Sequence, residues 1–166
     1  MFVETNMRAL KASPVKMIAE DFALLTSGTS ENFNTMTVSW GGVGELWGRD
    51  VAFVFVRPQR YTYSFMEQND IFTLTFFGGE YKEELALCGK LSGRDTDKIK
   101  ETGLTPATVG EGVTFAEAKT VLLCRKIAVS DMKPESFLDP TILQYYHEDD
   151  YHRIYVGEIL KVYTAE

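Results

Sequence analysis

Donor groups suited to a phosphate gather in the segment VAFVFVRPQRYTYSFM, residues 51–66. Pro58 has no backbone N–H, so it ends the preceding apolar strand and turns the chain. A helix then begins, and its first N–H groups lack intrahelical partners and carry partial positive charge. Side chains beside such a terminus bind a phosphate monoester, and the candidates are Arg57, Arg60, Tyr61 and Thr62. Alternatively, Thr62 only caps the helix and the arginines are solvated.

A second candidate segment is NTMTVSWG, residues 34–41, which has strand character but is unusually polar. Its backbone amides and hydroxyls are suited to bonding the polar rim of a planar heterocycle. The residues concerned are Asn34, Thr35, Met36, Thr37, Val38, Ser39 and Trp40. The alternative is an exposed edge strand. We expect the following GGVGE, residues 41–45, to break the strand.

Two further features complete the candidate site. Ser92, Gly93 and Arg94 form a loop in which small residues let the backbone approach a ligand closely. His152 lies in the acidic stretch HEDDYHR, and an unperturbed histidine titrates near neutrality, so it is suited to donating a proton or orienting a donor. A surface or interface histidine is the alternative. Cys88 and Cys124 form no CxxC pair and no zinc-ligand spacing, so we expect no metal site. We expect two buried thiols, with a disulfide between them as the alternative.

The elements that must position these residues are mostly strands. Runs of apolar or alternating residues predict strands, which we place at 21–26, 35–40, 51–56, 71–77, 113–115, 119–129 and 153–163. Gly157 is expected to form a bulge in the last of them. Helical spacing is found at 61–69, 80–89 and 95–103, and the last of these is expected to be capped by Asp95 or Thr96 and to stop at Gly103. Residues 136–147 are expected to be irregular or helical. Because strands do not alternate with long helices, the pattern favours a mostly antiparallel β-barrel with helical insertions.

Length and charge narrow the class further. The 166 residues suffice for one compact domain spanning 1–166. The net charge is −7 and the basic residues are scattered, which argues against a nucleic-acid surface. There is no apolar signal region at the N-terminus and no apolar run near the roughly 20 residues that a membrane helix needs. We therefore expect a cytoplasmic protein.

Taken in order, these segments resemble the flavin reductase-like family of FMN-binding split barrels. The matching pieces are NTMTVSWG, VAFVFVRPQRYTYSFM, FTLTFF at 72–77, CGKLSGRDTDK at 88–98 and HRIYVGEIL at 152–160. The resemblance runs from about residue 15 to the C-terminus and is strongest to the flavoredoxin-like branch. No single motif is specific, but the ordered set is.

The resemblance implies a six-stranded antiparallel split barrel that forms a homodimer, with FMN near the subunit interface. Residues 34–39 would follow the isoalloxazine, and Trp40 would form the pocket wall. Arg57, Arg60, Tyr61 and Thr62 would hold the ribityl phosphate, and Ser92, Gly93 and Arg94 would close the site. His152 would lie near the open face of the cofactor.

The implied reaction is hydride transfer from NAD(P)H to flavin N5, in which the flavin carries the chemistry and the protein sets its position. The alternative is a flavoredoxin-type electron carrier with tightly bound FMN, which would exchange electrons with a redox protein. FMN is expected rather than FAD, because the segment offers donors for one terminal phosphate and no second anion site.

Overall fold

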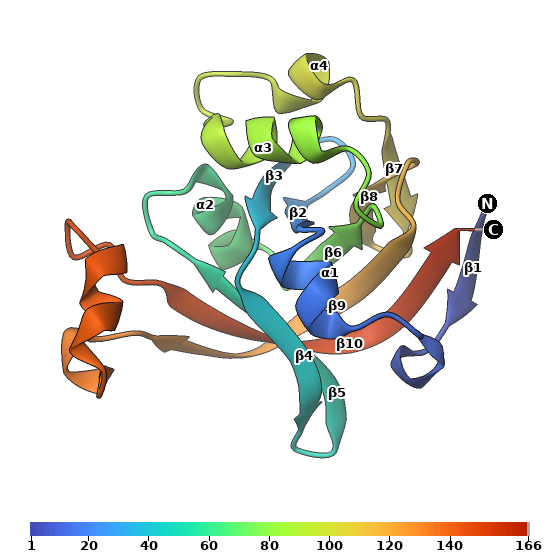
Figure 1. The fold of residues 1–166 in the computed structure, drawn as a ribbon. Coiled ribbons are helices and arrows are strands. Elements are labelled where there is room, and N and C mark those ends of the chain that lie inside the picture. Colours follow the sequence, from blue (N-terminus) through green and yellow to red (C-terminus); the bar gives the residue numbers. More distant parts are fainter. Residues whose placement is uncertain (166) are drawn as a thin grey trace.

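The computed structural model describes residues 1–165, and its centre is one antiparallel sheet of eight strands. The strand order is β3-β2-β6-β9-β10-β5-β4, and β1 pairs with β10 beside this path. Figure 1 shows the long strands β9 and β10 curving across the molecule below the helices, with the β4–β5 hairpin projecting past them. The strands are β1 (Phe2–Thr5), β2 (Ala23–Gly28), β3 (Phe33–Val38), β4 (Gly41–Leu46), β5 (Arg49–Val56), β6 (Ile71–Phe76), β9 (Thr120–Asp131) and β10 (Arg153–Ala165). A separate hairpin pairs β7 (Pro106–Val109) with β8 (Gly112–Phe115).

The helices lie outside this sheet. They are α1 (Pro14–Ala19), α2 (Tyr61–Gln68), α3 (Lys82–Lys90) and α4 (Lys98–Thr102). Figure 1 shows α2, α3 and α4 gathered at one end of the molecule, around the upper part of β3. Short 3₁₀ turns are found at Met7–Ala9, Pro134–Ser136 and Pro140–Tyr145. In residues 1–165, no helix combines the length and the apolar character needed to cross a bilayer.

Residues 132–152 form a long excursion between β9 and β10, which we call the strap. It holds two of the 3₁₀ turns and projects away from the sheet, at the left of Figure 1. The expectation of irregular or helical structure at 136–147 is thus confirmed. Tyr146 stacks on Phe137 and packs against Tyr151, with ring centroids 5.6 and 4.9 Å apart. Aromatic packing therefore holds the strap together.

The mostly β, antiparallel architecture is confirmed, but the sequence argument missed three strands, β1, β4 and β7. Residues 41–45 do not break the sheet; they form β4, which pairs with β5 from Gly41↔Val54 to Leu46↔Arg49. A strand begins at these glycines instead of ending there. Gly41 has no side chain, so its backbone can lie against the carbonyl of Phe53. The added strands β1 and β4 also explain why the sheet has eight members and not the six that the resemblance implied.

The predictions at Gly103 and Gly157 are confirmed, whereas the predicted N-cap of α4 is wrong. Gly103 ends α4 with φ of 68°, a left-handed conformation that favours glycine. The helix begins later than expected, at Lys98, because the Asp97 carboxylate accepts hydrogen bonds from the N–H groups of Ile99 and Lys100. Asp95 and Thr96 therefore precede the helix. Gly157 marks a register shift between β10 and β9, as the bulge expectation required.

The main core fills the space inside the curved sheet. Its fully buried members come from strands distant in sequence and include Leu25, Val54, Phe72, Leu122 and Tyr155. A smaller cluster lies under α3, where Leu85 and Cys88 pack with Leu24, Phe77 and Phe115. Burial of these apolar side chains is the main stabilising contribution to the fold. It fixes β3 against β2 and thereby the position of the polar segment at residues 34–39.

Replacing Gly157 by alanine is expected to destabilise the protein. A Cβ at this position would lie 2.6 Å from Cε1 of Phe72 and 3.1 Å from Cβ of Cys124, both in the core. Overpacking of this kind costs about 1–3 kcal/mol in free energy of unfolding. Urea denaturation of Gly157→Ala measures the loss. Gly42→Ala is the matched control, because no atom lies within 4 Å of its added Cβ; an equal effect at both positions would contradict the packing argument.

Candidate functional site

The end of β3 borders a cleft of about 200 Å³, which we call the strand cleft. Its floor is the polar segment, and its walls come from β5, the turn before α2 and the start of β10. The lining residues are Met36, Thr37, Val38, Ser39, Trp40, Phe55, Arg57, Arg60 and His152. Since β3 is the last strand in the sheet order, one edge of its backbone is outside the ladder. Backbone N–H and C=O groups on such an edge can bond a ligand where no other side chain occupies them.

A smaller pocket of about 110 Å³ adjoins the N-terminus of α2, and we call it the cation pocket. Its lining residues are Gln59, Arg60, Tyr61, Thr62, Lys90, Leu91, Ser92 and Lys98. Three of them carry positive side chains, and the helix terminus adds partial positive charge. Arg60 lines both the cation pocket and the strand cleft, so the two hollows adjoin.

Arg60 is fixed by the end of α3. Its guanidinium donates to the carbonyl of Gly89 at 2.7 Å and to that of Cys88 at 3.4 Å. Burial, with the nearby charge of Arg57, lowers the pKa of Arg60 from its usual value. A guanidinium that remains protonated in a desolvated position interacts strongly with an anion. Arg60 is therefore well suited to an anionic ligand at the junction of the two hollows.

Thr62 does not cap α2, because the N-cap is Arg60 and it makes no side-chain capping bond. Instead, the buried hydroxyl of Thr62 accepts a hydrogen bond from Nδ2 of Asn34 at 2.7 Å. A hydroxyl both accepts and donates, so Thr62, which lines the cation pocket, keeps its own proton for a second partner. Gly93 allows this arrangement, because a Cβ there would overlap Oδ1 of Asn34 and lie 3.0 Å from Cδ1 of Tyr61.

Lys98 was missed by the sequence argument. Its side chain is buried, and its Nζ donates to the carbonyls of Thr35 at 2.7 Å and Cys88 at 2.9 Å. An ammonium group has three donors, so one remains for a ligand in the cation pocket. Burial lowers its pKa to about 8, against an opposing effect of Cys88. The signal in the sequence was the Asp97–Lys98 pair, in which the aspartate caps a helix and fixes the lysine at its first position.

The structure separates Arg57 from the other predicted phosphate ligands. Arg57 lines the strand cleft but not the cation pocket, and its guanidinium forms an ion pair with Asp150 of the strap. It also donates to the carbonyl of Tyr145 at 2.8 Å and lies 5.1 Å from the ring centroid of Tyr146. The Asp150 carboxylate thus competes with a phosphate for the Arg57 guanidinium, and this ion pair holds the strap beside the strand cleft.

The other predicted residues divide between the hollows. Ser92 lines the cation pocket, whereas Gly93 and Arg94 line a neighbouring chamber. Trp40 is 46% exposed and forms one wall of the strand cleft, where its ring packs against Tyr145 and His152.

Among the described residues, no cluster of three or more His, Cys, Asp or Glu side chains is arranged to hold a metal ion.

His152 borders the strand cleft but is neutral in the folded protein. Its ring is buried, and Nδ1 is 2.8 Å from the hydroxyl of Tyr146. Burial is the main cause that lowers the pKa of His152 from 6.5 to about 4, and the charge of Arg57 adds to it. The sequence argument could give only the unperturbed pKa of a histidine, which is near neutrality. At neutral pH the ring is therefore a hydrogen-bonding group and holds no extra proton.

The two cysteines are both buried and unpaired. Burial raises the pKa of each thiol, although Lys98 and Arg60 partly oppose this at Cys88. The expectation of buried thiols is confirmed.

Comparison with known proteins now defines the class. The chain belongs to the flavin reductase like domain family, whose model matches residues 16–166. No curated protein matches the sequence.

Solved structures share the fold at low sequence identity. An FMN-binding domain of a flavin reductases-like enzyme from Shewanella baltica has a TM-score of 0.68 at 15% identity, covering 99% of this chain and 77% of that one. A flavoredoxin from Methanosarcina acetivorans has a TM-score of 0.65 at 22% identity, covering 99% and 75%. An FMN-binding protein from Thermus thermophilus with bound p-hydroxybenzaldehyde has a TM-score of 0.65 at 21% identity, covering 96% and 83%. These likenesses confirm the split-barrel fold.

The buried His152 predicts a pH-dependent loss of stability. Because its pKa is lowered from 6.5 to about 4 in the folded state, the unfolded chain binds the proton first as pH falls. The free energy of unfolding should therefore decrease as pH drops through that window, by up to about 3 kcal/mol from this group. Urea titrations of the wild type and His152→Gln measure it. The variant should lose less stability over the window, and parallel curves would refute the assignment.

Proposed function

We propose that this chain binds FMN and acts as an oxidoreductase that takes electrons from NADH or NADPH. The observation that carries the proposal is the junction of the strand cleft and the cation pocket at Arg60. One hollow offers a backbone edge and aromatic walls, and the other offers cations beside a helix N-terminus. A planar heterocycle joined to a phosphate matches both at once.

The cation pocket fits the phosphate of FMN. Arg60, Lys98 and the hydroxyl of Thr62 supply charged and neutral donors, and the first N–H groups of α2 add to them. The carbonyls of Thr35, Cys88 and Gly89 fix the two cations before any ligand binds. Such preorganised donors bind with little loss of conformational entropy.

The strand cleft fits the isoalloxazine. The free edge of β3 would bond the polar rim of the ring, with Thr37 and Ser39 nearby, and Trp40 would form a side wall. When bound, FMN supplies a ring that accepts a hydride at N5 and passes electrons onward. His152 would orient a ligand by hydrogen bonding through its neutral ring, because its lowered pKa leaves it without the second ring proton that an imidazolium could transfer.

An electron carrier of the flavoredoxin type is the second candidate, and the size of the cleft favours it. The strand cleft measures about 200 Å³, below the roughly 300–1,000 Å³ typical of small-molecule sites. Isoalloxazine alone would occupy most of this volume, leaving little room in one chain for a stacked nicotinamide. A carrier would instead exchange electrons with a redox protein, and the net charge of −7 suits a basic partner.

We also propose that the chain forms a homodimer, as the family resemblance implies. The exposed Trp40 at the wall of the strand cleft is consistent with cover from a second copy. Sedimentation analysis with and without FMN would report the oligomeric state.

The reductase and carrier proposals differ in their response to nicotinamide donors. The FMN-saturated protein is mixed anaerobically with NADH and then with NADPH, and the visible absorbance of the flavin is followed. Rapid bleaching by one donor is expected for the reductase. Bleaching by dithionite but by neither donor would support the carrier, and failure to bind FMN would overturn both.

Lys98→Met is expected to weaken FMN binding by about tenfold or more, because a charge-assisted hydrogen bond contributes about 1.5–3 kcal/mol. In the wild type, affinity should also fall as pH rises through about 8, where Lys98 loses its proton. Fluorescence titration with FMN measures both effects.

Lys100→Met is the matched control, since Lys100 is an exposed residue of the same helix and lines neither hollow. It should bind FMN normally, with the wild-type pH profile. An affinity in Lys98→Met equal to that of the wild type would remove Lys98 from the phosphate site.

A further inference from the structure

The strap separates the strand cleft from a hollow of about 670 Å³, which we call the strap hollow. Its lining includes Trp40, Ile154 and the strap residues Met132, Phe137, Tyr145 and Tyr146. Trp40 lines both hollows, and the Tyr145 ring packs on it with centroids 5.4 Å apart. The Tyr146 hydroxyl lies 2.8 Å from Nδ1 of His152, which lines the strand cleft. Aromatic side chains of the strap therefore form the partition between the two hollows.

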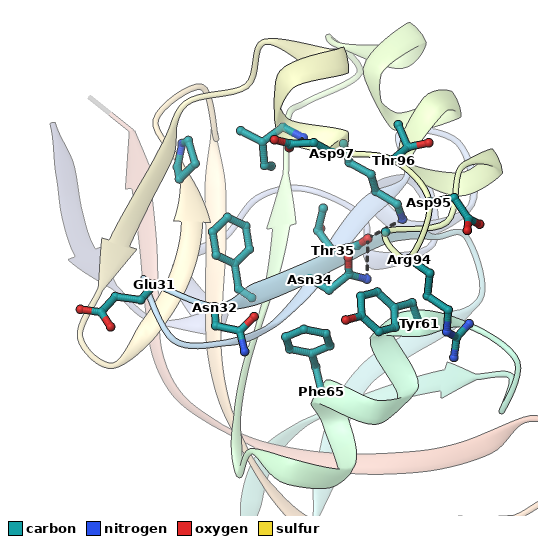
Figure 2. Close-up of a pocket in the computed structure, with 15 residues that line it drawn as sticks. Glu31, Asn32, Asn34, Thr35, Tyr61, Phe65, Arg94, Asp95, Thr96 and Asp97 are labelled. Carbon is teal, nitrogen blue, oxygen red and sulfur yellow. Dashed lines mark hydrogen bonds between the residues drawn. The ribbon is translucent and has the colours of Figure 1, made fainter.

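The other hollows offer the strand cleft little additional room. Figure 2 shows the chamber between the β2–β3 turn, α2 and the loop before α4, which measures about 620 Å³. This chamber shares no lining residue with the strand cleft. The cation pocket adjoins the strand cleft at Arg60 but measures only about 110 Å³. Room for a second planar ligand beside the strand cleft is therefore found on the side of the strap.

Arg57 holds the strap against the body of the protein. Its guanidinium forms an ion pair with the Asp150 carboxylate and donates to the carbonyl of Tyr145 at 2.8 Å. The same guanidinium lies 5.1 Å from the ring centroid of Tyr146. Gln59, in the turn that follows Arg57, donates to the same Asp150 oxygen at 2.8 Å. The turn between β5 and α2 thus fixes Asp150 together with both tyrosines of the partition.

The ion pair is placed where it can open. The side chains of Arg57 and Asp150 are 25% and 17% exposed, so water can replace either partner. The second carboxylate oxygen of Asp150, Oδ1, is buried without a hydrogen-bond partner among the described residues. An unpaired buried oxygen disfavours the closed position. Residues 132–152 also contribute no strand to the sheet and pack on one another through aromatic rings, so the strap can move as a unit.

We propose, on the basis of the proposed function, that the strap is a gate held shut by the ion pair of Arg57 with Asp150. When the pair separates, Tyr145 and Tyr146 move away from Trp40, and the strand cleft joins the strap hollow. The widened space admits the nicotinamide ring of the electron donor beside the flavin. The donor stabilises the open strap because it binds only in that state. Asp150 acts through Arg57 and is a positioning residue. The small volume of the strand cleft is then a property of the shut gate.

The test uses Asp150→Asn, which removes the charge of the carboxylate and keeps the size of the side chain. Asp149→Asn is the matched control, because Asp149 is exposed and is not the residue that pairs with Arg57. Asparagine also accepts the left-handed backbone of Asp149, where φ is 51°. Asp150→Glu restores the carboxylate. Hydrogen exchange of the strap amides in the flavin-free full chain measures opening. Anaerobic bleaching of the FMN-saturated protein by limiting NADH or NADPH measures access.

The strap amides of Asp150→Asn should exchange about tenfold faster than those of the wild type, because loss of charge-assisted hydrogen bonds populates the open strap. The bleaching rate at limiting donor should also rise about tenfold, since apparent affinity scales with the open fraction. Asp149→Asn should change neither rate, and Asp150→Glu should return both toward the wild type. If Asp150→Asn does not fold, Tyr145→Ala removes a ring of the partition from an exposed position and should raise both rates in its place.

The remaining outcomes are distinct. Unchanged exchange of the strap amides in Asp150→Asn would show that the ion pair does not hold the strap, and the proposal would fail. Faster exchange with an unchanged bleaching rate would overturn the gating role. Bound FMN that neither donor bleaches, in the wild type or in Asp150→Asn, would also overturn it and leave the electron carrier as the function. Failure of the wild type to bind FMN would instead overturn the proposed function, and with it the gating of a flavin site.

Discussion

The candidate site depends on one buried ammonium group. Lys98 connects three elements. It is the first residue of α4, and its Nζ donates to carbonyls at the end of α3 and in β3. Burying a charge is costly unless polar partners surround it. Those two carbonyls are the partners, and they leave one donor directed toward the cation pocket. Lys98 therefore holds the edge of β3 next to the end of α3 and the start of α4. The strand cleft, the cation pocket and the neighbouring chamber lined by Gly93 and Arg94 lie around these three elements.

A second constraint is the close approach of the 91–97 loop to α2 and β3. Gly93 lies so near the Asn34 amide that no side chain fits between them. The Asn34 amide in turn donates to Thr62, which fixes the first turn of α2. This series of contacts explains why segments that are distant in the sequence share one site. It also explains why Thr62 is buried although it lies in the polar first turn of a helix.

The sequence predicted the parts of the structure that follow from local pattern. Alternating and apolar runs gave most strands, Gly103 gave the end of α4, and Gly157 gave the bulge. The glycine-rich residues 41–45 misled the analysis, because their pairing with β5 is a tertiary property that glycine permits. Arg57 was grouped with Arg60 by proximity in sequence, but its partner Asp150 is distant in the chain and no local signal shows it. Lys98 was missed for a related reason: its burial depends on elements that only the fold brings together.

Burial of Cys88 and Cys124 has a chemical consequence for a protein of this family. Oxidation of cysteine proceeds through the thiolate, and both side chains stay in the protonated form because their pKa values are raised. Reduced flavins react with oxygen and release peroxide close to where they are held. Cys88, whose backbone carbonyl helps to fix Lys98 and Arg60, lies beside the candidate site yet presents no nucleophilic sulfur to that peroxide. Under the proposed function, the packing beneath α3 therefore keeps the Cys88 thiol unreactive toward an oxidant formed at the flavin.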